Sequence, residues 1–360
     1  MAETKFQIFF PLAISTHSLM AKRQYEVWKG KNKFIFKGRL IFGPDAKSLI
    51  CTSLLIIVPV IIFCTNVARN LFDETSAGYA ILMATVVFTL YVLLLLLLTS
   101  ARDPGIVPRN LHPPAEEICY DSSASIDVGR RTPTPRLPPT KVVVVNGVPV
   151  RVKYCITCQL YRPPRCSHCS VCDNCVERFD HHCPWVGQCI GLRNYLSFFL
   201  FISSSTILCI FIFAMSALNI KFLTDDYGTV WNAIKESPLS VVLMVYCFIF
   251  LWFVGGLTCF HLYLIGTNQT TYETFRYRGA ERLDRGCLNN FREVFCSKIK
   301  PSRNNFHAYV QENEGGLNRC MNSGTYIGDL DRNRREKVED DREIGGDLLK
   351  ISQRREAEDA

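Results

Sequence analysis

Residues 75–101 read TSAGYAILMATVVFTLYVLLLLLLTSA and contain no lysine, arginine, aspartate or glutamate. An α-helix rises ~1.5 Å per residue, so about 20 apolar residues are enough to cross a hydrocarbon core of ~30 Å. Three further stretches, at residues 48–68, 194–220 and 237–272, also lack these charges. Four such runs in 360 residues argue against buried helices of a soluble protein. They predict an α-helical polytopic membrane protein with four transmembrane helices.

Lysine and arginine are distributed unevenly around these stretches. Nine precede the first stretch, twelve fall in the central loop at residues 102–193, and seventeen follow the last stretch. The two short loops hold only one and two. Because cytosolic segments carry an excess of these residues, both termini and the central loop are predicted to be cytosolic. The net charge of +8 then fits anionic lipid headgroups, and no basic face of a soluble domain indicates nucleic acid.

The central loop contains a cysteine-rich block, CITCQLYRPPRCSHCSVCDNCVERFDHHCPWVGQC, at residues 155–189. A disulfide framework is one interpretation, but disulfides are rare in the reducing cytosol. Repeated Cys-x2-Cys pairs in a cytosolic loop instead predict zinc sites, because two thiolates at this spacing can reach one tetrahedral ion. The block holds eight cysteines and three histidines. Two tetrahedral sites use eight of these eleven candidates, so three remain.

One group of residues in the block has the pattern of a catalytic site. Cys183 lies close to His181, and Asp180 directly precedes that histidine. A cysteine with a nearby base and an orienting carboxylate is typical of an activated nucleophile. A zinc-bound thiolate is a weaker nucleophile, so Cys183 is predicted to stay off the metal. Spacing alone does not distinguish His181 from His182 as the base.

Residues 155–198 resemble the cysteine-rich domain of the DHHC family of protein S-acyltransferases. The likeness rests on Cys155-x2-Cys158, Arg162-Pro163, His168-Cys169-x2-Cys172-x2-Cys175, Asp180-His181-His182-Cys183-Pro184-Trp185-Val186 and Cys189-x-Gly191-x2-Asn194. Further family motifs are Asp103-Pro104-Gly105 after the second span, Thr270-Thr271-x-Glu273 after the fourth, and Asn289-Asn290-Phe291 in the tail. The resemblance covers roughly residues 25–300 and is greatest to plant members. Gln188 departs from the asparagine that many members carry.

The resemblance implies an enzyme that moves a palmitoyl or other long-chain acyl group from acyl-CoA to cysteine thiols of membrane-associated proteins. The transfer would be ping-pong, through an acyl thioester on Cys183, with Asp180 orienting His181 and His181 taking the proton of Cys183. Two structural Zn²⁺ ions are implied. One would be held by Cys155, Cys158, His168 and Cys175, and the other by Cys169, Cys172, His182 and Cys189.

The resemblance also assigns residues outside the catalytic motif. Trp185, Phe198 and Phe201 occupy positions that line the acyl cavity in the family. Thr270, Thr271 and Glu273 are expected to pack the cysteine-rich domain onto the spans, and Asp103-Pro104-Gly105 is expected to form a turn that ends the second span. The partners implied are palmitoyl-CoA and membrane-associated proteins with cytosolic cysteines. The expected location is the plasma membrane, with the Golgi or another endomembrane as the alternative.

These observations predict the organisation of the chain. In order, we expect a basic cytosolic arm at 1–48, transmembrane helices 1 and 2 at 49–100, a cytosolic linker with the Asp-Pro-Gly motif at 101–152, the two-zinc domain of short hairpins at 153–195, transmembrane helix 3 at 196–218, a non-cytosolic loop at 219–238, transmembrane helix 4 at 239–264, an ordered segment with the Thr-Thr-x-Glu motif at 265–300, and a disordered cytosolic tail at 301–360. Alternating valines around Asn146-Gly147 predict a β-hairpin at the end of the linker.

Two other classes of function fit the sequence less well. A membrane-tethered zinc scaffold without catalysis would have no need for Asp180, His181 and Cys183 together. A transporter would carry ionisable residues in its spans to mark an ion path, and these spans carry almost none. The acyltransferase is therefore the predicted function.

Overall fold

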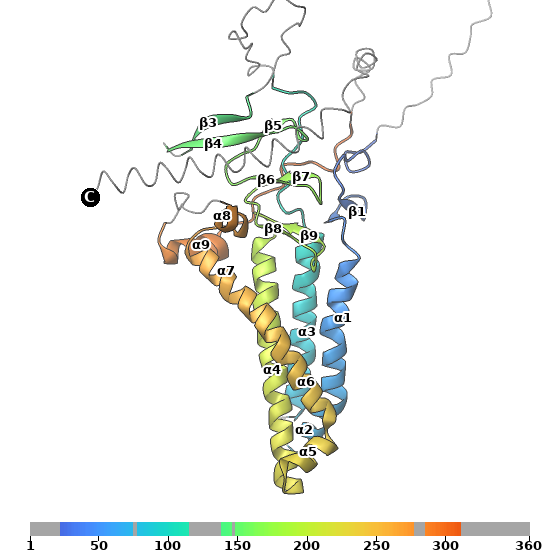
Figure 1. Ribbon diagram of the computed structural model, residues 1–360. Coiled ribbons are helices and arrows are strands. Elements are labelled where there is room, and N and C mark those ends of the chain that lie inside the picture. Colours follow the sequence, from blue (N-terminus) through green and yellow to red (C-terminus); the bar gives the residue numbers. More distant parts are fainter. Residues whose placement is uncertain (1–21, 75–77, 115–137, 146–147, 277–284, 311–360) are drawn as a thin grey trace, which may run out of the picture.

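A computed structural model describes residues 22–74, 78–114, 138–145, 148–276 and 285–310. Four helices in these ranges are long and apolar enough to cross a membrane: Ser48–Leu71, Gly78–Ala101, Tyr195–Tyr227 and Pro238–Gly266. They form one bundle, and the cysteine-rich domain lies at one end of it, between the second and third helices in sequence (Figure 1). The predicted fold class is confirmed.

The first span consists of α1 (Ser48–Ile62), a π-helical turn η1 (Phe63–Val67) and α2 (Ala68–Glu74). Pro59 lies inside α1 and has no N–H, so the carbonyl of Leu55 lacks its usual donor. The hydroxyl of Tyr246, from another span, donates to that carbonyl at 2.7 Å. A side chain on a neighbouring helix thus replaces the hydrogen bond that the proline removes.

The other spans are α3 (Gly78–Ala101), α4 (Tyr195–Tyr227), and the series α6 (Pro238–Phe250), η3 (Leu251–Gly255) and α7 (Gly256–Gly266). Helix α4 continues past the predicted end of its span at residue 218 and stops at Gly228, whose φ is 77°. Helix α5 (Val230–Glu236) occupies much of the loop predicted at 219–238. Buried Asn219 fastens this turn by donating to Ser240 Oγ at 3.0 Å.

The region between α3 and α4 is built from short antiparallel strands. Strands β3 (Thr140–Val145), β4 (Val148–Cys155) and β5 (Leu160–Tyr161) form one sheet, and the pairing of β3 with β4 confirms the predicted hairpin, although its turn at 146–147 lies outside the described residues. Strand β6 (Ser167–Cys169) pairs with β7 (Asn174–Val176), and β8 (His181–Cys183) pairs with β9 (Gln188–Ile190). The prediction of short hairpins is confirmed.

Segments from both ends of the described chain pack onto this region (Figure 1). The N-terminal part carries β1 (Lys33–Ile35) and β2 (Leu40–Phe42), and the C-terminal part carries α8 (Thr271–Arg276) and α9 (Cys287–Cys296). Phe306 is buried between Trp28 and Phe34, with ring centroids 5.2 and 5.3 Å away. Residues 301–310 therefore differ from the predicted disordered tail, because Phe306 anchors them. Residues 311–360 and 1–21 lie outside the described ranges.

The main hydrophobic core joins the helix bundle to the last strand hairpin. Cys183, Val186 and Ile190, on and between β8 and β9, are buried in the same cluster as side chains of all four spans. These include Val60, Leu96, Phe198 and Leu243. The β8–β9 hairpin thus rests directly on the end of the bundle.

Candidate active site and metal centres

The eight predicted zinc ligands fall into two compact clusters. One comprises Cys155, Cys158, His168 and Cys175, and the other comprises Cys169, Cys172, His182 and Cys189. In each, one ligand atom per residue lies within 4.8 Å of the others, and the cysteines are buried. The clusters contain the ligands that the family resemblance implies, in the same two groups of four.

The spacing of donor atoms fits a tetrahedral zinc ion. With Zn–S of ~2.3 Å and Zn–N of ~2.0 Å, neighbouring nitrogen and sulfur ligands lie roughly 3.5 Å apart. In the first cluster, His168 Nδ1 lies 3.6, 3.5 and 3.8 Å from the sulfur atoms of Cys155, Cys158 and Cys175. In the second, His182 Nδ1 lies 3.3 and 3.6 Å from those of Cys172 and Cys189. Both clusters can therefore hold zinc.

Each cluster histidine directs its other ring nitrogen at a carboxylate. His168 Nε2 lies 3.5 Å from Asp173 Oδ1, and His182 Nε2 lies 3.1 Å from Asp45 Oδ2. A carboxylate that accepts from the distal N–H fixes the tautomer and the ring orientation of a metal-binding histidine. The Nδ1 atoms are thereby left to face the thiolates.

Asp180, His181 and Cys183 come together beside the second cluster. The Asp180 Oδ2 atom lies 2.7 Å from His181 Nδ1, and the carboxylate side chain is fully buried. Among the described residues, His181 and Cys183 belong to neither cluster of four. The structure thus separates His181 from His182, which spacing could not do.

Asp180 and His181 shift each other's pKa toward the charged forms. Burial lowers the pKa of His181, but hydrogen bonds with Asp180 and Cys183 outweigh it and raise that pKa to about 9. Burial alone would raise the pKa of Asp180, but the interaction with His181 lowers it overall. The arrangement favours a carboxylate beside a histidine that holds a proton, as a thiolate–imidazolium pair requires.

Asp180 is also held by the segment that follows the last span. Thr271 donates to it twice, from its N–H to Oδ1 at 3.0 Å and from its hydroxyl to Oδ2 at 2.8 Å. The N–H of Tyr272 donates to the backbone carbonyl of Asp180 at 3.1 Å. The predicted packing motif at residues 270–273 therefore contacts Asp180 of the predicted catalytic group directly.

Three residues of the spans, His261, Tyr195 and Phe198, lie next to this group. His261 on α7 is 1% exposed, and its ring centroid lies 6.1 Å from that of His181. The hydroxyl of Tyr195 lies 3.1 Å from His261 Nδ1. Phe198 packs edge-on against both imidazoles, at 5.4 and 5.1 Å. The histidine in the last span is an interior polar residue with a hydrogen-bond partner.

Residues 150–278 match the family described as DHHC palmitoyltransferase. The chain is 63% identical over 352 residues to Protein S-acyltransferase 8 of Arabidopsis thaliana, and the alignment covers 95% of this chain and 86% of that protein. It is 60% identical over 346 residues to Probable protein S-acyltransferase 9 of the same plant, with coverage of 93% and 83%. The chain belongs to the DHHC family of protein S-acyltransferases. The predicted membership, enzyme class and transfer of palmitoyl groups to proteins are confirmed.

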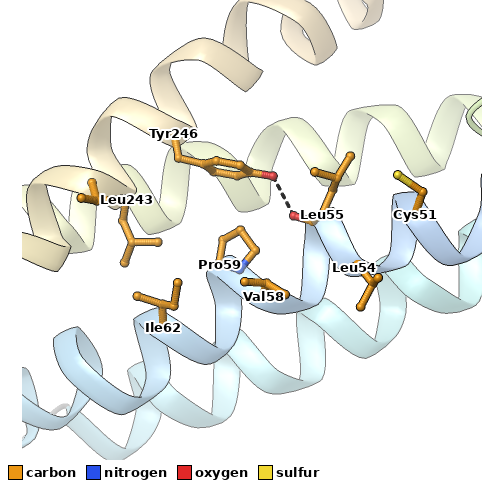
Figure 2. A pocket seen from close by; sticks show the side chains of 9 residues that line it. Cys51, Leu54, Leu55, Val58, Pro59, Ile62, Leu243 and Tyr246 are labelled. Carbon is orange, nitrogen blue, oxygen red and sulfur yellow. Dashed lines mark hydrogen bonds between the residues drawn. The ribbon is translucent and has the colours of Figure 1, made fainter.

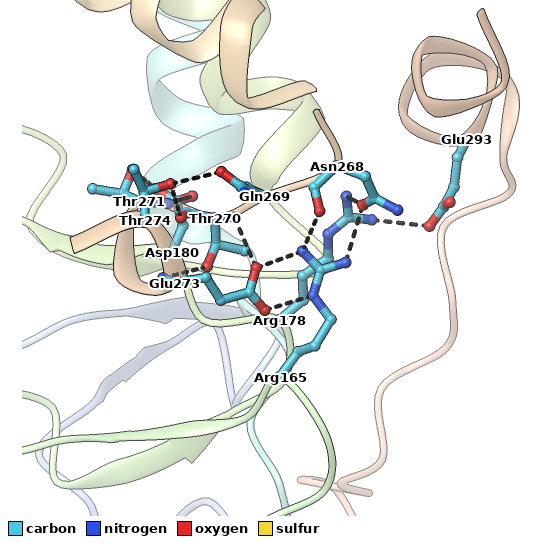
Figure 3. A network of polar contacts seen from close by, with 10 residues as sticks. All are labelled: Arg165, Arg178, Asp180, Asn268, Gln269, Thr270, Thr271, Glu273, Thr274 and Glu293. Atoms are coloured by element: carbon cyan, nitrogen blue, oxygen red, sulfur yellow. Dashed lines mark hydrogen bonds and ion pairs between the residues drawn. The ribbon is translucent and has the colours of Figure 1, made fainter. Parts of the chain in front are cut away.

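A polar network fastens the cysteine-rich domain of this acyltransferase to its C-terminal segment (Figure 3). Arg165 makes two bonds of 2.7 Å to the carboxylate of Glu273, and it also donates to Asn268. Arg178 donates to Asn268 Oδ1 at 3.0 Å and to Glu293 at 3.1 Å. Two arginines of the cysteine-rich domain thus converge on one asparagine just after the last span.

Residues 270–273 have a local reason for their shape. The Thr270 N–H donates to Glu273 Oε2 at 2.9 Å, and the Glu273 N–H donates to Thr270 Oγ1 at 3.2 Å. This reciprocal pair is a capping box at the start of α8. The capping box thereby orients Thr271, whose side chain and N–H both donate to Asp180.

The Asp103-Pro104-Gly105 motif joins the end of α3 to the cysteine-rich domain. The buried carboxylate of Asp103 accepts from the N–H groups of Gly105 and Ile106 at 2.9 and 2.8 Å. Its other oxygen pairs with Arg193 at 2.8 Å, just before α4. Gly105 has a φ of 110°, which favours glycine. One buried carboxylate thus joins the turn after α3 to the residue that precedes α4.

The three residues predicted for the acyl cavity differ in their surroundings. Phe198 and Phe201 are 1% and 8% exposed and lie in the same core cluster as Cys183, whereas Trp185 is 57% exposed. A separate apolar groove of about 320 Å³ runs between α1 and α6 (Figure 2). It is lined by Cys51, Leu54, Leu55, Val58, Pro59, Ile62, Val242, Leu243 and Tyr246. None of the three predicted residues, all of them described, lines that groove.

Sequence reasoning missed several residues that hold the site. Asp45 has no recognisable motif around it, and its role depends on a contact with a residue far along the chain. Gln188, noted only as a departure from the family, is fully buried and donates to the carbonyl of Ile41 at 2.8 Å. Serine and threonine in a span give no indication of a partner outside their own helix. The sequence therefore contained no pattern that would have found these contacts.

Proposed function

We propose that this S-acyltransferase carries the acyl group on Cys183, between an acyl-CoA donor and a cysteine of an acceptor protein. The observation that supports this most directly is the 2.7 Å contact between Asp180 Oδ2 and His181 Nδ1, beside a cysteine that belongs to neither metal cluster. Because Nδ1 faces the carboxylate, Nε2 is the atom left to exchange a proton with a thiol.

The proposed reaction has two balanced steps. His181 takes the proton of Cys183, the thiolate attacks the acyl-CoA carbonyl, and a new S–C bond forms as the bond to the CoA sulfur breaks. The leaving CoA thiolate receives that proton. In the second step His181 takes the proton of the acceptor thiol, whose thiolate attacks the acyl-enzyme. Cys183 leaves as a thiolate and recovers the proton from His181, so no net charge accumulates.

We propose that the two clusters each hold one structural zinc ion. Four protein ligands leave no open position for a water molecule or a substrate, so the metal would supply rigidity to the hairpins. The donor distances given above support this assignment. The second ion would hold His182, the residue between His181 and Cys183, and thus fix the backbone on which both catalytic side chains are mounted.

The proposed orientation places both termini and the cysteine-rich domain in the cytosol. Two observations support it: the excess of lysine and arginine in these segments, and the position of the described N-terminal and C-terminal segments at the same end of the bundle (Figure 1). The proposed acceptors are membrane-associated proteins with cytosolic cysteines. The plasma membrane is the proposed location, with an endomembrane such as the Golgi as the alternative.

The acyl chain is proposed to lie among the spans below Cys183. Keeping it out of water is worth ~0.8 kcal/mol per CH₂ group, so a long chain strongly favours the membrane side of the site. Cys183 shares its apolar cluster with Phe198 and Phe201, which supports their proposed contact with the chain. Trp185 is proposed to lie at the membrane surface beside them.

A labelling experiment tests the acyl carrier. Purified wild type, Cys183→Ser and Cys166→Ser would be given an alkyne analogue of palmitoyl-CoA, and label would be read with and without hydroxylamine. Cys166 is the matched control, since it lies in the same domain and in neither cluster of four. We expect hydroxylamine-labile label on the wild type and on Cys166→Ser alone. Equal label on Cys183→Ser would contradict the proposal, and unlabelled but zinc-loaded wild type would favour a scaffold.

A further inference from the structure

The turn that follows Cys183 is held by hydroxyl groups from two membrane helices. Residues 184–187 connect β8 to β9, and the N–H of Gly187 closes the turn by donating to the Cys183 carbonyl at 2.9 Å. The carbonyls of the next three residues, 184–186, instead face hydroxyl groups of the membrane helices. We propose that Ser48, Thr52 and Ser100 are positioning residues, which hold Cys183 in register with the acyl thioester by binding these carbonyls. The inference rests on the proposed role of Cys183.

Each of the three carbonyls accepts from a different hydroxyl. Thr52 Oγ1 donates to the carbonyl of Trp185 at 2.7 Å, and Ser100 Oγ donates to that of Val186 at 2.8 Å. Ser48 Oγ contacts the carbonyl of Pro184, and it also lies 2.8 Å from the carbonyl oxygen of Asp45. Two of the donors come from α1 and one from the end of α3, so the turn is tied to both helices at once.

These contacts are unusual for hydroxyls within spans. A serine or threonine in a helix ordinarily donates to a carbonyl of its own preceding turn. Thr65, Thr85, Thr89 and Thr99 do so, with distances of 2.7 or 2.8 Å. Thr52 and Ser100 are buried, as Thr85, Thr89 and Thr99 are, but they donate to the turn after Cys183 instead. Their hydroxyls thus satisfy polar groups of the cysteine-rich domain, not of their helices.

The segment before α1 also packs against the turn. Gly187 has a φ of 69°, and a Cβ there would lie 2.5 Å from the carbonyl oxygen of Asp45. Next to it, the amide of Gln188 donates to the carbonyl of Ile41. The hydroxyls and the backbone before α1 together leave the turn one position relative to the spans.

This position matters because acyl transfer depends on the placement of the attacking sulfur. A misplacement of about 1 Å can lower a rate by roughly 100-fold without any change in the reacting groups. Losing one hydroxyl would leave a buried carbonyl unpaired and let the turn shift. The acyl chain would still bind among the same helices. The rate of the chemical step should therefore fall, while the half-saturating concentration of palmitoyl-CoA stays the same.

Single-turnover acylation of Cys183 by palmitoyl-CoA tests this in detergent-purified full-length protein. Thr52→Val removes the hydroxyl at nearly constant shape, Thr52→Ser keeps it, and Ser100→Ala removes the second one. Thr65→Val and Thr89→Val are controls, since those hydroxyls bond within their own helices. We expect Thr52→Val and Ser100→Ala to acylate about 10-fold more slowly. Thr52→Ser and both controls should stay close to the wild-type rate.

Three outcomes would overturn the positioning role. One is a Thr52→Val protein with the wild-type rate, and another is a Thr52→Ser protein as slow as Thr52→Val. The third is loss of zinc or of cooperative unfolding in Thr52→Val, since the hydroxyl would then hold the fold and not the cysteine. A wild type that takes no label on Cys183 would instead reject the proposed function, so the two failures are distinguishable.

Discussion

The two metal clusters are alike in ligands but differ in what surrounds them. In the first, the carboxylate beside His168 belongs to Asp173, on the turn between β6 and β7, and Asp173 also pairs with Arg109 at 3.0 Å. In the second, the carboxylate beside His182 belongs to Asp45, which precedes α1. The first cluster is completed locally, whereas the second is completed by the start of the membrane domain.

We relate the source of each carboxylate to the residues that lie beside each cluster. The second cluster includes His182, on the same strand as His181 and Cys183, and the proposed reaction requires that strand to keep a fixed place relative to the spans. The contact between Asp45, just before α1, and His182 holds the strand in place relative to the membrane helices. The first cluster carries no catalytic side chain, so it needs only to fold its own loops.

The largest expected effect is the loss of one cysteine ligand from each cluster. Cys189→Ser should lose one zinc ion and reduce acylation of Cys183 below detection, because β9 is the partner strand of the catalytic strand. Cys158→Ser should also lose one zinc ion but keep measurable acylation, because Cys158 contacts the linker through Asn110 and not the catalytic hairpin. Metal content by elemental analysis and acylation with labelled palmitoyl-CoA measure both. Equal activities would show that the clusters act as one unit.

The carboxylates are expected to have the next largest effect. Asp45→Asn and Asp173→Asn each replace the carboxylate that accepts from a histidine N–H with a neutral amide, and changes of this kind lower metal affinity by about 10–100-fold. Only Asp45→Asn should also slow acylation when zinc is saturating. Competition with a chelator gives the affinities, and single-turnover labelling gives the rates. A slow Asp173→Asn protein at full zinc occupancy would contradict the proposed division of roles.

The sequence predicted the four spans, the hairpins and the grouping of Asp180, His181 and Cys183 because each depends on local pattern. Uncharged runs specify the spans, and closely spaced cysteines specify metal sites. The family resemblance supplied the division of ligands between the two clusters, since spacing left His181 and His182 equivalent. These predictions required no knowledge of which distant segments meet.

The sequence did not predict contacts between segments far apart in the chain. Asp45 reaches His182, Phe306 packs between aromatic residues of the N-terminal segment, and Ser100 binds a carbonyl beyond the linker. Each contact is made by an ordinary residue whose neighbours carry no motif. Helix ends were also uncertain: α4 runs on to Tyr227 because the first charge after its apolar stretch does not stop a helix.

Two arginines, Arg165 and Arg178, attach the cysteine-rich domain to the C-terminal segment, and their contacts can be compared in the same way. Arg165, between the first two ligands of the first cluster and its histidine, makes the bidentate contact with Glu273. Glu273→Gln would break a largely buried ion pair and weaken the capping box of α8, at a cost of about 2 kcal/mol in the free energy of unfolding. A lower midpoint of thermal unfolding in detergent would reveal it. An unchanged midpoint would mean that Arg165 finds another acceptor.

The smallest expected effect concerns the ion pairs of Glu293 on α9. Glu293 pairs with Arg178 at 3.1 Å and with Arg285 at 3.8 Å, but the Arg178 side chain is 17% exposed and that of Arg285 is 66% exposed. Exposed ion pairs are screened by water and salt, so Arg285→Ala should change the free energy of unfolding by less than about 0.5 kcal/mol.

Arg178→Ala is the matched comparison for that substitution. It should destabilise the protein more than Arg285→Ala does, because it also removes a hydrogen bond to the buried Asn268 and leaves Glu293 with its weaker partner. Thermal unfolding of the two variants at low and high salt separates the contributions, since only the exposed pair should respond strongly to salt. If Arg285→Ala were as damaging as Arg178→Ala, the exposed ion pair would stabilise the protein as much as the buried contacts of Arg178 do, and burial would not explain how α9 is held to the cysteine-rich domain.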